Sequence, residues 1–117
     1  MNPEFLIVTP LVEEWNAVCR RITNPEFSEN ECRGLISKYF VVCVLTGVGE
    51  ERNTAFITNS IIKWQPHWII LAGITAGLKR AKLGDIILAT HIYGYNFGKI
   101  EYGKYLHGTY RLAKIPT

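Results

Sequence analysis

Two apolar runs in this chain each end in a glycine-rich loop, and this feature constrains the fold most. Residues 39–46 (YFVVCVLT) lead into Gly47-Val48-Gly49, and residues 68–72 (WIILA) lead into residues 73–77 (GITAG). Short apolar runs bounded by turn residues are typical of buried strands. Glycine lets a ligand approach the backbone closely. The pattern therefore predicts strands that end at a binding edge, although glycines that only turn the chain would give the same sequence.

The other segments alternate between strand and helix patterns, which predicts an α/β fold. In chain order we expect a strand (residues 5–9), a helix (11–22), a polar loop (25–31), two adjacent strands (32–37 and 39–46), a helix (50–64), and two more strands (68–72, and 86–89 running on to 93). The second helix should bury Ala55, Thr58, Ile61 and Ile62. Residues 94–108 are rich in glycine and tyrosine and predict a loop, with a β-ribbon as the alternative.

Crossover helices favour a mostly parallel, mixed sheet with one antiparallel hairpin. Helices on both faces of such a sheet would give a three-layer αβα fold. In open α/β sheets, ligands bind at the carboxyl ends of the strands. The sequence places residues 10–14, 47–49 and 73–77 at that edge.

Composition excludes several classes of protein. The 117 residues suit a single domain spanning 1–117, and a hydrophobic fraction of 48% can supply a core. Thirteen basic against ten acidic residues give a net charge of +3, and the basic residues are scattered, which argues against nucleic acid. No apolar run is long enough to span a bilayer and no basic start precedes one, so we expect a cytoplasmic protein without a membrane partner.

The three cysteines, Cys19, Cys32 and Cys43, show no paired spacing. They predict buried free thiols rather than a disulfide framework or a zinc site. The three histidines are too far apart in sequence to form a recognisable ligand set, and His67 should be structural. We expect no metal and no cofactor.

Glu13 and Glu14 open the first helix directly after a predicted buried strand. Acidic residues at a helix N-terminus interact favourably with the helix dipole, so both could simply face solvent. Successive helical residues point about 100° apart, which leaves room for only one of the two in a pocket. A carboxylate in that place could act as a general base toward water.

These elements together resemble the nucleoside phosphorylase and nucleosidase superfamily, which includes purine nucleoside phosphorylase and methylthioadenosine/S-adenosylhomocysteine nucleosidase. The resemblance covers residues 5 to about 100 and rests on TPLVEEWNAV, TGVGEERNTAF and PHWIILAGITAGLKRAKLGDIILATHIYGY, in that order. Its most specific element is the strand-Gly-x-x-Ala-Gly-Leu segment followed by Leu-Gly-Asp and another strand. It implies a nucleoside phosphorylase-like fold and a purine nucleoside as ligand.

The resemblance also implies roles for individual residues. The last glutamate of the acidic run activates the attacking water in the nucleosidases, and Glu14 occupies that position. The residues implied to line the nucleoside pocket are Pro10, Leu11, Val48, Gly49, Ile74, Thr75 and Ala76. Phosphorylases carry an arginine two residues before the second loop, where this chain has Leu71, so the sequence leans toward hydrolysis. Thr75 and the loop amides leave phosphorolysis, a glycosyl transfer to phosphate, as an option.

The chain is about half the length of a domain of this family, so it is expected to be an apparently truncated, N-terminal part of one. The absent half carries the Met-Glu segment that grips the ribose hydroxyls and the aspartate that protonates the purine. We therefore expect purine nucleoside N-glycosidic bond cleavage only with a missing C-terminal half. The alternative is a catalytically inactive nucleoside-binding or oligomerisation module, which an exposed apolar sheet edge would favour as a homo-oligomer. A decayed coding sequence and an unrelated doubly wound domain are further readings.

Overall fold

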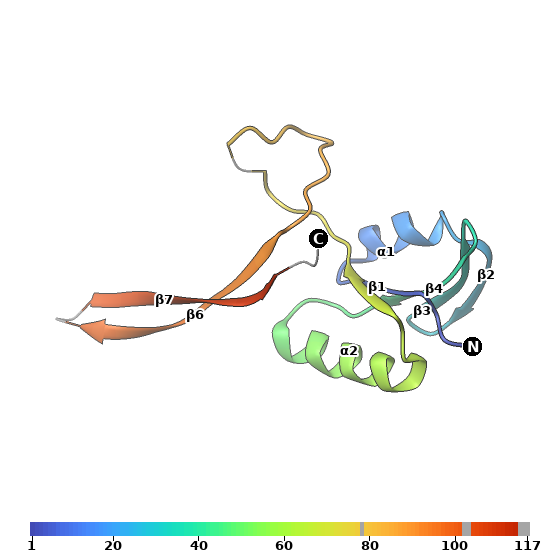
Figure 1. Ribbon diagram of the computed structural model, residues 1–117, viewed down its shortest axis with the longest axis horizontal. Coiled ribbons are helices and arrows are strands. Elements are labelled where there is room, and N and C mark those ends of the chain that lie inside the picture. The colour runs from blue at the N-terminus through green and yellow to red at the C-terminus, as the bar shows by residue number, and fades with distance from the viewer. Residues whose placement is uncertain (78, 102–103, 115–117) are drawn as a thin grey trace. The chain divides into compact units, whose positions relative to one another are not determined.

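A computed structural model describes residues 1–77, 79–101 and 104–114, which form two compact units, Met1–Ala76 and Gly77–Thr117 (Figure 1). The first unit holds β1 (Phe5–Thr9), α1 (Val12–Cys19), β2 (Thr23–Ser28), β3 (Glu31–Ile36), β4 (Tyr39–Leu45), α2 (Glu50–Trp64) and β5 (Trp68–Leu71). The second unit holds β6 (His91–Glu101) and β7 (Lys104–Lys114). Within the described residues, neither helix has the length and apolar character that a bilayer crossing requires. Leu78, part of the motif behind the family resemblance, lies outside the described residues.

The first unit is a mixed five-stranded sheet in the order β2-β3-β4-β1-β5. β1 lies between β4 and β5 and is parallel to both, with Ile7 opposite Cys43 on one side and Ile70 on the other. β3 is antiparallel to β2 and β4, so it alone runs against the other strands of this sheet. The sequence prediction of a mixed sheet is confirmed, but two of its four strand pairings are antiparallel, so the sheet contains two antiparallel hairpins rather than the one predicted.

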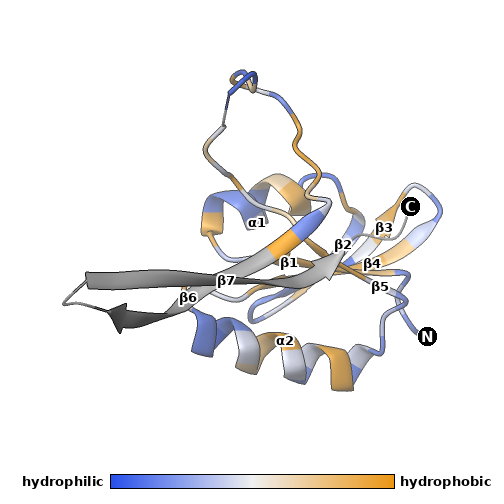
Figure 2. Cartoon of the chain, turned by 60° about the vertical axis from the view of Figure 1, so that its left-hand side comes forward, coloured by the Kyte–Doolittle hydropathy of each residue, from blue (hydrophilic) through white to orange (hydrophobic). Residues whose placement is uncertain are grey.

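One helix covers each face of the sheet (Figure 1). On the α1 face, Ile7, Cys32, Val41 and Cys43 pack with Cys19 and Ile22, and all six are buried. On the other face, Leu6, Val8, Val42 and Val44 pack against Ile57 and Trp64 of α2. The alternation along β1 and β4 reflects strand geometry, because successive side chains point to opposite faces. Both helices mix hydrophilic and hydrophobic residues, as helices with one buried face do (Figure 2).

The predicted boundaries of the first helix and the following loop are wrong. α1 ends at Cys19, with Arg20 as its C-cap, so Arg20 and Arg21 do not close the helix. Ile22 turns back into the α1-face core instead. Strand β2, all of whose residues are exposed, overlaps the predicted polar loop over residues 25–31. β2 is an edge strand, so it pairs with one neighbour only, and it tolerates Pro25 at its register shift. Its polar, proline-containing sequence therefore predicted a loop.

The predicted inner stripe of α2 is also wrong, although its bounds are confirmed. Ala55, Thr58, Ile61 and Ile62 are exposed. The inward face is formed by Asn53, Ile57, Ser60 and Trp64. Trp64 packs edge-on against Phe40 with ring centroids 6.2 Å apart, so a long-range aromatic contact helps fix the rotation of the helix.

Strand β5 forms as predicted but is not buried, and a predicted strand is missing. The exposed fractions of Trp68, Ile69, Ile70 and Leu71 run from 42% to 70% because β5 is the last strand of the sheet. Residues 86–89 form no strand, and Ile86 is 97% exposed, because a strand needs a neighbour to bond its backbone. Residues 91–114 contain the antiparallel β6–β7 ribbon, which confirms the ribbon alternative.

Candidate functional site

The Glu14 carboxylate is the buried charge at the carboxyl end of the sheet. The residue is 8% exposed, whereas Glu13 beside it is exposed, as the angular spacing of helical residues predicts. Its Oε1 accepts a hydrogen bond from the Leu11 N–H at 2.9 Å. This is the return half of a capping box, in which the N3 carboxylate binds the N-cap amide. One oxygen of Glu14 therefore stabilises the start of its own helix.

The second oxygen of Glu14 reaches a loop that is distant in sequence. Its Oε2 accepts a hydrogen bond from the Ile74 N–H at 2.5 Å. Gly73 makes this approach possible, because a β-carbon there would lie 2.7 Å from Oε2. The carboxylate therefore joins the first turn of α1 to the loop after β5.

Three strand ends lie side by side at this edge. The Thr46 N–H donates to the Thr9 carbonyl at 3.1 Å, and the Ala72 N–H donates to the Val8 carbonyl at 3.0 Å. The fully buried Thr9 hydroxyl donates to the Val44 carbonyl at 2.9 Å. The loops after β4 and β5 thus leave the sheet on either side of the β1–α1 connection, as the sequence predicts.

The predicted lining residues are mostly open to solvent. Leu11 is 39% exposed, Val48 70% and Ile74 75%, and Pro10 is half-buried. Gly49, Thr75 and Ala76 are also exposed. The hydrogen bonds of Glu14 gather Leu11 and the Gly73–Ile74 backbone, and they do not extend to the Val48–Gly49 loop. These residues form an open wall around a buried carboxylate.

The loop after β4 is held by two side chains that sequence reasoning missed. The Thr46 hydroxyl lies 2.6 Å from the Asn53 Oδ1, and the Asn53 Nδ2 donates to the carbonyls of Gly47 (3.1 Å) and Gly49 (2.8 Å). Gly47 and Gly49 have φ angles of 81° and 115°, which favour glycine. The sequence signal for this contact was an asparagine in the first turns of the helix. It was not distinctive, because asparagines that face solvent are also common there.

A cation also lies at this loop. A β-carbon on Gly47 would lie 2.8 Å from the Arg52 Cδ and 3.1 Å from its Nη1, so the arginine side chain crosses the face of Gly47. Leu71, which stands where phosphorylases carry an arginine, is apolar and 70% exposed. Arg52 is therefore a guanidinium near the candidate site that the sequence pattern did not reveal.

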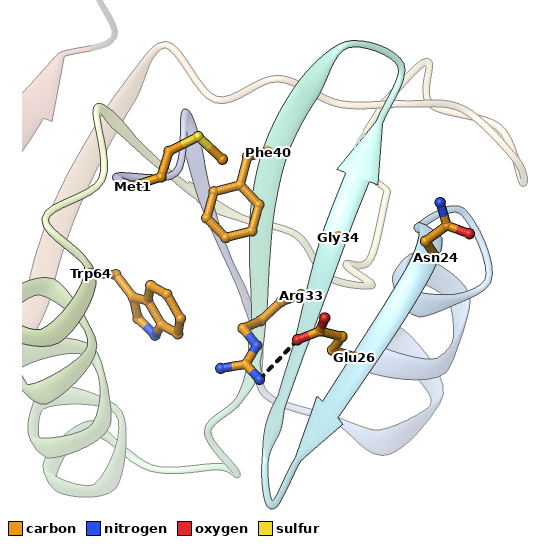
Figure 3. A pocket seen from close by; sticks show the side chains of 7 residues that line it. All are labelled: Met1, Asn24, Glu26, Arg33, Gly34, Phe40 and Trp64. Atoms are coloured by element: carbon orange, nitrogen blue, oxygen red, sulfur yellow. Dashed lines mark hydrogen bonds and ion pairs between the residues drawn. The ribbon is translucent and has the colours of Figure 1, made fainter.

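A separate concavity lined by charged residues lies at the other end of the strands (Figure 3). It has a volume of about 350 Å³ and is lined by Met1, Asn24, Glu26, Arg33, Gly34, Phe40 and Trp64. Arg33 forms an ion pair with Glu26 at 3.3 Å and lies 5.6 Å from the centre of the Trp64 ring. None of the predicted site residues lines it, so it is separate from the Glu14 site.

Histidine and cysteine side chains do not build a metal site in the described part of the chain, where no group of three or more possible ligands gathers. His67 lies at the amino end of β5 and its Nδ1 is 2.8 Å from the Glu4 Oε2, which agrees with a structural role. The three cysteines are free and buried, as predicted. Burial raises the pKa of the Cys43 thiol to about 11, and burial also raises the pKa values of Cys19 and Cys32.

Comparison with known proteins identifies the fold. No protein-family model matches the sequence, and no curated protein matches it. The structure is similar to a solved protein assigned as a 5'-methylthioadenosine/S-adenosylhomocysteine nucleosidase of Borrelia burgdorferi, which is bound to adenine. The TM-score is 0.53 at 24% identity, over 57% of this chain and 32% of that chain. This chain therefore has an α/β nucleosidase-like fold and spans about a third of the solved protein.

Proposed function

We propose that this chain carries one wall of a purine nucleosidase site, in which Glu14 activates the attacking water. The proposal rests on the buried Glu14 carboxylate, which is held between the first turn of α1 and the loop after β5. The fold shared with an adenine-bound nucleosidase supports it. The chain would be the N-terminal part of a three-layer αβα domain, and the seven predicted lining residues would face the nucleoside.

The geometry of Glu14 suits a general base. Each of its two oxygens accepts one backbone N–H, which fixes the orientation of the carboxylate. An ionised carboxylate has about four acceptor positions, so about two remain for a water molecule. In the proposed step Glu14 takes a proton from water, and the water oxygen bonds to the anomeric carbon. The carbon–nitrogen bond breaks and its electron pair passes to the purine.

The purine must also be protonated as it leaves, which Glu14 cannot do at the same time. The family resemblance assigns that proton to an aspartate in the C-terminal half. We therefore expect cleavage when this chain is joined to the C-terminal half of a nucleosidase. General base catalysis contributes about 10²- to 10⁴-fold to such a reaction.

The test measures free base released from methylthioadenosine, adenosine and inosine by the chain alone and by the joined form. Release by the joined form should fall at least 100-fold in Glu14→Gln, within the range of a general base. Glu13→Gln is the matched control, because this carboxylate is exposed, and it should retain activity. Absence of release from both forms, or full activity in Glu14→Gln, would contradict the proposal.

Water is the proposed nucleophile rather than phosphate, because Leu71 stands where phosphorylases carry arginine. Arg52 beside Gly47 is the cation that could still favour phosphate. Hydrolysis predicts the same rate of base release with and without phosphate in the buffer. A rate that rises with phosphate and falls in Arg52→Gln would instead identify a phosphorylase.

A second candidate function, self-association without catalysis, is favoured by the exposed edge of β5. Natural edge strands usually carry charges or prolines that prevent pairing, and β5 has neither over Trp68–Leu71. Its side chains are apolar on both faces: Ile69 and Leu71 lie beside Leu6 and Val8, and the other two lie on the α1 face. Such a strand is typical of a sheet interior.

A second copy of this chain is the occupant we propose for the edge. A two-fold axis perpendicular to the sheet would make the two β5 strands antiparallel and keep the α1 faces on one side. Residues opposite each other must then share a face. Two registers fit this condition: one places Ile69 opposite Ile69 of the second copy, and the other places Ile70 opposite Ile70 of the second copy.

A further inference from the structure

The side-chain amide of Asn53 makes a compact set of contacts with the loop after β4. Its Nδ2 donates to the Gly47 carbonyl at 3.1 Å and to the Gly49 carbonyl at 2.8 Å. Its Oδ1 lies 2.6 Å from the Thr46 hydroxyl, and its backbone N–H donates to the Gly49 carbonyl at 3.0 Å. Thr46 is 2% exposed and its own N–H is bonded to β1. The loop is thus connected to the sheet through one carboxamide.

These contacts determine which way the loop backbone faces. In a trans peptide the carbonyl and the following N–H lie in one plane and point in opposite directions. Because the Gly47 carbonyl points at Asn53, the Val48 N–H points away from α2. No atom lies within 4 Å of a β-carbon built on Gly49, so the loop is open to solvent there. Asn53 therefore aims a backbone donor away from the helix.

The loop does not hold this conformation through local preference alone. Gly47 and Gly49 adopt positive φ angles, and glycine is the residue with the most alternative conformations to lose. The N-cap of α2 is Gly49, which offers no side-chain cap. The two glycines are therefore restrained by the side chain of Asn53 from the following helix and, at the Gly47 carbonyl, by the Thr46 hydroxyl at 3.1 Å.

We propose that Asn53 is a positioning residue for the nucleoside site, which it serves by fixing the Gly47–Gly49 loop in its ligand-facing conformation. The identity of the ligand rests on the proposed function. The effect of Asn53 on the loop rests on the hydrogen bonds alone. Asn53 contacts the backbone rather than the ligand, so its removal should weaken binding by loosening the loop.

Asn53→Asp is the sharpest variant, because it preserves the shape of the side chain, replaces the two Nδ2–H donors by an acceptor oxygen and introduces a negative charge. Thr46→Val removes the hydroxyl that orients the amide and provides a milder, independent variant. Asn59→Asp is the matched control, because it makes the same change at an exposed position of the same helix. Hydrogen exchange of residues 45–52 reports on the loop without any ligand. Calorimetry of the form joined to the C-terminal half of a nucleosidase, with methylthioadenosine and with adenine, reports on the site.

Loss of two hydrogen bonds should raise exchange in residues 45–52 about tenfold in Asn53→Asp and two- to threefold in Thr46→Val. Exchange in β1 and β4 should stay as in the original chain, as should all exchange in Asn59→Asp. Affinity for the probe that binds should fall by a similar factor in each loop variant. Protonating the introduced carboxylate restores one donor, so loop protection in Asn53→Asp should recover below about pH 5. A role limited to side-chain shape predicts no such recovery.

Loop exchange unchanged in Asn53→Asp would overturn the inference whatever the ligand does. So would unchanged affinity in a loop variant when the joined form binds. If the joined form binds neither probe, the proposed function fails, and the exchange experiment still tests the restraint on the loop.

Discussion

Glu14 joins two parts of the chain that are far apart in sequence. A carboxylate that accepts N–H groups from its own helix start and from Ile74 is both a structural residue and a candidate base. The two roles are compatible, because the structural bonds use only part of its acceptor capacity. They also explain why one glutamate of the pair is buried and the other is not.

Gly73→Ala tests this junction by changing the loop and leaving Glu14 in place. The new β-carbon would lie 2.7 Å from the Glu14 Oε2, so the carboxylate must shift and lose its bond to Ile74. We expect the free energy of unfolding to fall by about 1–3 kcal/mol, because a part-buried hydrogen bond to a charged group is lost. Chemical denaturation measures this loss. Base release by the joined form should fall at least tenfold, and a variant as stable and active as the original would contradict the junction.

The buried thiols predict how stability depends on pH. Burial raises the pKa of Cys43 from 9.0 to about 11, and the pKa of Cys19 rises as well. Above pH 9 the unfolded chain loses thiol protons that the folded chain retains, so stability must fall as pH rises. The contribution of the protonated thiols to the free energy of unfolding is complete below pH 9. The contribution of Cys43 is lost by about pH 11.

Denaturation at a series of pH values between 9 and 11 measures this slope. Each buried thiol contributes roughly 1.4 kcal/mol per pH unit at most. Cys43→Ala should show a shallower slope than the original chain, since lysine and tyrosine titrate in both. Equal slopes in the two proteins would show that Cys43 ionises as readily in the folded state as in the unfolded state.

At the scale of elements, β5 combines the composition of a central strand with the position of an edge strand. Ile70→Lys places one charge on this edge, in the manner of natural edge strands. If two copies pair through β5, light scattering should show a dimer for the original chain and a monomer for Ile70→Lys. Ile62→Lys, at an exposed α2 position, is the control and should leave the dimer intact. A monomeric original chain at high concentration would refute the pairing.

The elements also show which features of the fold local sequence predicts and which depend on long-range packing. The α2 bounds followed from Gly49 at one end and Gln65-Pro66 at the other, which are local signals. Its buried face did not follow, because Trp64 meets Phe40 from another element. Strand β2 was missed because its pairing with β3, rather than its own composition, makes it a strand.

At the scale of the whole molecule, the two hydrophobic clusters lie within the first unit. Their buried members and packing partners run from Phe5 to Ala72, and this unit ends at Ala76. A fragment of residues 1–76 should therefore unfold cooperatively on heating, with a midpoint within a few degrees of the full chain. Circular dichroism measures both. A fragment without a cooperative transition, beside a full chain that has one, would show that residues after 76 are required for the core.

The sequence by itself determined the order of the elements up to β5 apart from β2, the bounds of β1 and α2, and that only one of the two neighbouring glutamates is buried. These depend on local periodicity, on turn residues and on the angle between neighbouring helical side chains. Tertiary structure decided the α2 face, the exposure of β5, the absence of a strand at residues 86–89, and the grip of Asn53 on the glycine loop. Each of these depends on which distant backbone or ring lies opposite, and no local pattern contains that information.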